Sequence, residues 1–78
     1  MIVDEVQTGF CRTGKMMAAD WEDARPDILA MGKSMSGGAV PASGVVCDAF
    51  IMDNIGPGDH GSTYGGNPLA MACSRAAV

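Results

Sequence analysis

The sequence predicts an α/β fold with at least one parallel pair of strands, and three observations support this. Two short apolar segments, residues 1–3 and 27–31, are separated by enough chain for one crossover helix. A third segment, residues 42–47, is apolar and ends in β-branched residues. Hydrophobic residues make up 47% of the chain and 11 of its 78 residues are glycine, which predicts an ordered chain with many tight turns.

The first strand is expected at residues 1–3, because this apolar run ends at two acidic residues. Residues 15–22 contain good helix formers and are expected to form the crossover helix. Pro26 disfavours helix in the residue before it and ends this segment. The second strand is then expected at residues 27–31, parallel to the first.

The second half of the chain is expected to contain two helices joined by a long polar loop. Residues 48–55 have the composition of a short helix, and residues 56–59 carry the glycine and proline of a loop. Residues 60–66 continue as a glycine-rich polar loop. Asn67 and Pro68 then supply the N-cap and the first residue of a helix that continues to the end of the sequence.

Composition excludes several classes of function. The net charge is −4 and no cluster of basic residues occurs, which argues against a nucleic-acid partner. No apolar run approaches the roughly 20 residues that span a membrane, and no signal peptide is visible. The three cysteines have no metal-ligand spacing and their odd number predicts no disulfide framework, so we expect no metal site and a reducing compartment.

Lys33 is the first candidate for chemistry, because it follows an apolar run and precedes small, flexible residues. An amine held at the end of a buried strand can attack a carbonyl and form a Schiff base. Burial favours the neutral, nucleophilic form of a lysine. Taken alone, Lys33 is better explained as an ordinary loop lysine in water.

Asp4 and Gln7 change that balance when they are considered with Lys33. Pyridoxal phosphate requires a lysine for its Schiff base and an acidic partner for its ring nitrogen. Asp4 and Lys33, at the ends of successive parallel strands, are placed to face one ring, and Gln7 can donate to its phenolic oxygen. Individually, Asp4 is better explained by a helix cap or surface ion pair, and Gln7 by a solvated loop.

Ser62 and Thr63 lie among glycines in the polar loop. Hydroxyls and free backbone N–H groups suit a phosphate dianion. By itself such a loop is most often only a turn, so this is a weaker prediction.

Three segments together resemble the class III pyridoxal-phosphate-dependent aminotransferases. Residues 4–15 resemble the pyridine-binding segment of this family, residues 26–33 its Schiff-base lysine segment, and residues 58–70 its second phosphate-binding loop. The resemblance covers nearly the whole chain in the family's order. Within the family, residues 32–38 with Pro41, Ser43 and residues 51–52 are most like the ornithine aminotransferases.

The resemblance implies a fold and a set of roles. The fold is part of the fold type I large domain, with a mostly parallel sheet and crossover helices. Asp4 pairs with the ring nitrogen, Gln7 contacts the phenolic oxygen and Lys33 forms the Schiff base and moves the proton. Thr63, with Ser62 beside it, binds the phosphate of the cofactor in the partner subunit, so a homodimer is required.

The implied reaction moves the δ-amino group of ornithine to 2-oxoglutarate, giving glutamate semialdehyde and glutamate. Acetylornithine or another ω-amino acid is the alternative donor, and an aminomutase on the same scaffold is a further alternative. The chain ends in a helix and begins in a strand, so we expect residues 1–78 to be an incomplete cofactor domain that lacks its N-terminal part and the small domain. A truncated chain without cofactor binding therefore stays open, and the family occurs in both mitochondria and cytosol.

Overall fold

The computed structural model describes all residues from Met1 to Val78 and has a three-stranded sheet at its centre. The strands are β1 (Ile2–Asp4), β2 (Ile28–Met31) and β3 (Gly44–Cys47), in the order β1-β2-β3. Each strand matches an expected apolar segment to within two residues at either end. The α/β class is confirmed.

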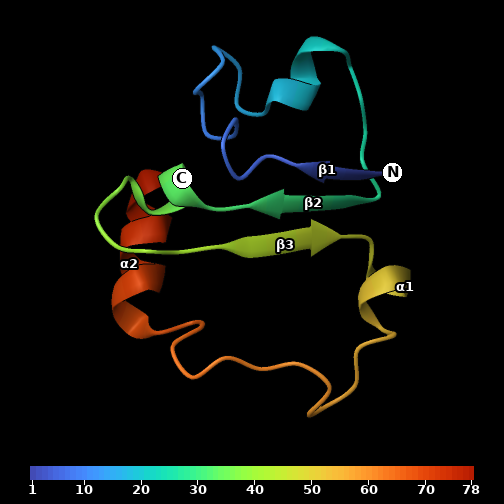
Figure 1. Ribbon diagram of the computed structural model, residues 1–78, viewed down its shortest axis with the longest axis vertical. Helices are drawn as coiled ribbons and strands as arrows, with labels where there is room; N and C mark the ends of the chain where they lie inside the picture. The colour runs from blue at the N-terminus through green and yellow to red at the C-terminus, as the bar shows by residue number, and fades with distance from the viewer.

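The sheet is mixed, with one parallel and one antiparallel pairing. β1 runs parallel to β2, with Asp4 opposite Ala30. β3 runs antiparallel to β2, with Met31 opposite Gly44 (Figure 1). The short connection between β2 and β3 holds only a single helical turn, so the chain reverses direction instead of crossing over the sheet.

The expected crossover helix at residues 15–22 is wrong. Only the 3-10 helix η1 (Ala18–Trp21) forms there. Met17 is extended, and its N–H donates to the Asp20 carboxylate at 2.9 Å, so the helix begins one residue later. Asp23 has a φ of 50°, which ends the helical path. A segment this short does not offset the cost of helix nucleation by itself.

The remaining helices lie at opposite ends of the sheet (Figure 1). The 3-10 helix η2 (Lys33–Ser36) follows β2, and α1 (Ala49–Met52) follows β3. α2 (Pro68–Ala77) packs against η2. Its predicted N-cap is confirmed, since Asn67 Oδ1 accepts from Ala70 N at 2.9 Å. The helical prediction for residues 48–55 is confirmed for its first turn, and residues 56–66 form the expected loop.

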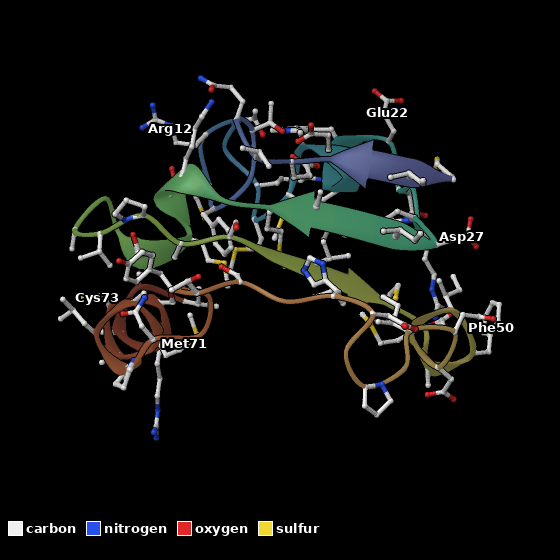
Figure 2. The ribbon with its side chains drawn as sticks, turned by 60° about the horizontal axis from the view of Figure 1, so that its bottom comes forward. Arg12, Glu22, Asp27, Phe50, Met71 and Cys73 are labelled. Carbon is white, nitrogen blue, oxygen red and sulfur yellow. The ribbon has the colours of Figure 1, made fainter.

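The core of the chain is small. Only 7 of 78 residues are buried, and among large apolar side chains only Met31 is. Phe50, Ile2 and Val46 are each more than half exposed, and Figure 2 shows Phe50 projecting outward at the end of the molecule that carries α1. An isolated domain of this size normally removes roughly 60% of its surface from water. The apolar faces of this sheet are therefore left without partners within the chain.

Candidate functional site

Lys33 is the first residue of η2, two residues beyond Met31 at the end of β2. Its φ is 42°, in the left-handed region that non-glycine residues adopt at a cost of about 1–2 kcal/mol. Such strained residues concentrate at functional sites. The Lys33 side chain is exposed, as expected for a lysine in a loop.

Lys33 and Gln7 are brought together from positions 26 residues apart. Lys33 Nζ donates a hydrogen bond to Gln7 Oε1. Gln7 lies on the turn after β1, and Lys33 follows β2. Because the two strands are parallel and in register, both turns leave the sheet at the same edge. This is the edge at which α/β sheets place their ligands.

Asp4 is the last residue of β1, at that same edge. Its side chain is exposed, and Oδ1 accepts from Val6 N at 2.9 Å. This bond caps the turn that carries Gln7. The local capping role considered for Asp4 is therefore present, and Oδ2 has no partner in the chain.

Two open hollows meet at Lys33. The first encloses about 730 Å³ and is lined by Gln7, Arg12 and Lys33 among others. The second encloses about 480 Å³ and is lined by Lys33, Ser62 and the start of α2. Asp4 and Thr63 line neither hollow. Of the five residues expected at the site, the structure therefore gathers Gln7, Lys33 and Ser62.

Ser62 is held in a tight turn. Its Oγ accepts from Gly65 N at 3.0 Å, which leaves the hydroxyl proton free to donate. A Cβ on Gly65 would lie 2.9 Å from the Ser62 Cβ, so this turn requires glycine at that position. Thr63 is exposed beside Ser62.

Two residues near the site were not expected from the sequence. Arg12 brings a guanidinium to the rim of the first hollow, and Figure 2 shows it at the end of the molecule opposite Phe50. Glu5 is 1% exposed, the largest fully buried side chain in the chain. Two acidic residues at the end of a strand are normally expected to be exposed to solvent. The sequence feature that could have indicated a buried Glu5 is Thr8, three residues further along, whose hydroxyl donates to it.

The Glu5 carboxylate is stabilised in its charged form. Burial raises the pKa of Glu5, but hydrogen bonds from Thr8, Ala19 and Ala18 together lower the pKa below its ordinary value of 4.5. Hydrogen-bond donors therefore stabilise the negative charge of Glu5, and no basic side chain forms a salt bridge with it.

Paired cysteines, clustered metal ligands and long apolar helices would mark other kinds of site. The three cysteines are free, with Cys11 exposed. No group of three or more His, Cys, Asp or Glu side chains is placed to hold a metal ion. None of the helices combines the length and the apolar character needed to cross a bilayer.

A lysine and a glutamine meet at the carboxyl edge of this α/β sheet, and a serine-glycine loop lies beside the lysine. The profile of the family described as "Aminotransferase class-III" matches residues 1–78. The chain belongs to this family.

The curated proteins most similar to this chain include several ornithine aminotransferases. The "Ornithine aminotransferase" of Oceanobacillus iheyensis is 58% identical over 77 residues, which is 99% of this chain and 19% of that protein. The mitochondrial ornithine aminotransferase of Oryza sativa is 56% identical over 78 residues, 100% of this chain and 16% of that protein. This chain therefore spans a fifth or less of the length of these curated relatives.

Solved structures agree with the fold. The ornithine aminotransferase of Toxoplasma gondii superimposes with a TM-score of 0.94 at 58% identity, over 97% of this chain and 18% of that chain. An acetylornithine aminotransferase from Elizabethkingia anophelis gives 0.93 at 59% identity, over 97% and 19% respectively. The fold of the chain is that of one segment of these aminotransferases.

Proposed function

We propose that residues 1–78 form the lysine-bearing part of a cofactor domain in a pyridoxal-phosphate-dependent aminotransferase. The observation that carries this proposal is the contact between Lys33 Nζ and Gln7 Oε1 at the carboxyl edge of β1 and β2. It brings an amine and an amide from two distant turns to the point where both hollows meet.

The donor set fits pyridoxal phosphate. Lys33 offers a primary amine, and the Asp4 carboxylate at the same sheet edge has one oxygen without a partner. Gln7 offers an amide, and the Ser62 turn offers a hydroxyl proton. An amine, a carboxylate, an amide and a hydroxyl complement the aldehyde, ring nitrogen, phenolic oxygen and phosphate of this cofactor.

When bound, pyridoxal phosphate supplies a ring that accepts the electrons released at the substrate carbon. Lys33 anchors the group and moves a proton at Nζ, first as base and then as acid. Asp4 keeps the ring nitrogen protonated, and Gln7 orients the ring through its phenolic oxygen. Thr63, with Ser62 beside it, would hold the phosphate of the cofactor in the partner subunit.

We propose ornithine as the amino donor and 2-oxoglutarate as the acceptor. Relatives named ornithine aminotransferase at 58% and 56% identity support this choice. Acetylornithine is the second candidate, because a structure of that name is 59% identical over the same segment. The matched segment is nearly equally similar to both, so it does not separate the two substrates.

We further propose that the segment works within a longer chain and a homodimer. The exposed apolar faces and the small core support packing against further parts of a large domain. Thr63 is exposed and lines neither hollow beside Lys33, which suits a residue that contacts the cofactor of a partner subunit. A chain that binds no cofactor on its own is the alternative that the small core also favours.

A chimaera tests the proposal. This chain replaces the 77 matched residues in the Oceanobacillus iheyensis relative, and Lys33→Ala is compared with Lys15→Ala, which removes the only other lysine of the chain. We expect borohydride-trapped cofactor on Lys33, seen by peptide mass spectrometry, and ornithine-dependent formation of glutamate. Lys33→Ala should lower turnover by at least about 100-fold, and Lys15→Ala by little.

Label on Lys15 or elsewhere, or equal turnover in both variants, would contradict the assignment of Lys33. Turnover with acetylornithine but not with ornithine would select the second candidate. The unfused 78-residue chain, titrated with pyridoxal phosphate in the same way, shows whether the segment binds the cofactor without the rest of a large domain.

A further inference from the structure

Glu5 is a buried charge for which the proposed chemistry has no use. The backbone turns away from β1 immediately after Asp4, and the Glu5 side chain is only 1% exposed. A buried carboxylate is costly unless hydrogen bonds stabilise it. Glu5 lies in the chain between Asp4 and Gln7, two residues proposed to bind the cofactor, so a change in its contacts can move both of them.

The Glu5 side chain joins two separate loops. Oε2 accepts from the Thr8 hydroxyl on its own turn. Oε1 accepts from Ala19 N at 2.8 Å, in the 3-10 helix 14 residues further along the chain. The carboxylate is thus a clamp between the turn at residues 5–9 and the helix η1.

The turn at residues 5–9 is closed tightly around this clamp. Gly9 N donates to Glu5 O at 2.8 Å, and Glu5 N donates to Ala30 O of β2 at 2.8 Å. A Cβ on Gly9 would lie 2.9 Å from Glu5 O, so no larger residue fits there without a shift. Gln7 is at the middle of the turn, where its exposed side chain reaches Lys33.

We propose that Glu5 is a positioning residue that holds Gln7 against Lys33 by clamping the turn at residues 5–9 to η1. Its importance for catalysis rests on the proposed function. The clamp consists only of residues of this chain, so it is measurable without added cofactor. Loss of the clamp frees the Gln7 side chain and with it the Lys33 amine.

Reactivity of the Lys33 amine tests the clamp without any cofactor. Acetic anhydride at limiting concentration acylates lysines at a rate set by their freedom and protonation, and peptide mass spectrometry reads Lys33 alone. Glu5→Gln is compared with Glu22→Gln, the same chemical change at the only other glutamate, which is exposed and points outward in Figure 2. The measurement is made on the cofactor-free chimaera.

We expect Glu5→Gln to raise the acylation rate of Lys33 about three- to tenfold, the size expected for coupling within one hydrogen-bond network. Glu22→Gln should leave the rate unchanged. In a Gln7→Ala background, Glu5→Gln should add no further increase, because Gln7 is then absent. A general loss of structure would raise the rate in both backgrounds.

Equal rates for Glu5→Gln and Glu22→Gln overturn the proposal, as does an increase that persists in the Gln7→Ala background. If Glu5→Gln does not fold, Thr8→Val takes its place, since it removes one donor to Glu5 at nearly constant volume. An increase in the acylation rate of Lys33, smaller than the one expected for Glu5→Gln, supports the clamp. An unchanged rate overturns it. Failure of cofactor binding would refute the proposed function and leave this measurement intact.

Discussion

Replacing Gly9 by alanine tests the closeness of the turn that carries Gln7. The added Cβ would lie 2.9 Å from Glu5 O and 3.2 Å from Met17 Sδ. Met17 is a flexible side chain and can move aside, but the carbonyl oxygen belongs to the backbone beside β1. Gly9 does not have a positive φ, so the effect is steric and not a matter of backbone preference.

The expected cost is about 1–3 kcal/mol, the range measured for overpacked sites. Gly61→Ala is the matched control, because a Cβ there meets nothing within 4 Å and its φ is not positive. That substitution should be neutral or stabilise by up to about 1 kcal/mol through the unfolded state.

Urea unfolding of the chimaera and its two variants, followed by circular dichroism, measures both changes in the free energy of unfolding. The acylation rate of Lys33 is read on the same samples, and Gly9→Ala should raise it because the turn is displaced. A Gly9→Ala chimaera as stable as Gly61→Ala, with Lys33 unchanged, would refute the close packing of this turn.

Two further predictions concern stability. The pKa of Glu5 is lowered on folding, so its contribution to stability is present above pH 4.5 and is lost as the pH falls through the lower value of the folded state. Unfolding free energy measured from pH 7 to 3 should therefore fall more steeply in the parent than in Glu5→Gln; parallel curves would contradict this. Asn67→Ala removes the acceptor for Ala70 N and should cost α2 about 1 kcal/mol. Asn54→Ala, which removes only exposed bonds after α1, should cost a few tenths, and equal losses would mean that Asn67 is no cap.

The burial of Glu5 could not be predicted from the sequence, and neither could the surroundings of Lys33. Both depend on which distant segments cover a side chain. Glu5 is enclosed by η1, whose Ala19 is 14 residues away, and Lys33 lies at a surface that residues of the chain do not cover. No local pattern around either residue carries that information.

The sequence by itself determined the strands, the cap of α2 and the loop at residues 56–66, because apolar runs, proline, glycine and asparagine act on their near neighbours. The resemblance of three long motifs indicated the family, which the family comparison confirms. Only the tertiary structure decided that β3 turns back antiparallel and that residues 15–22 wind into a single 3-10 turn. It also decided that Lys33 meets Gln7 across 26 residues. These outcomes follow from sheet register and from contacts between segments far apart in the chain, where packing outweighs local preference.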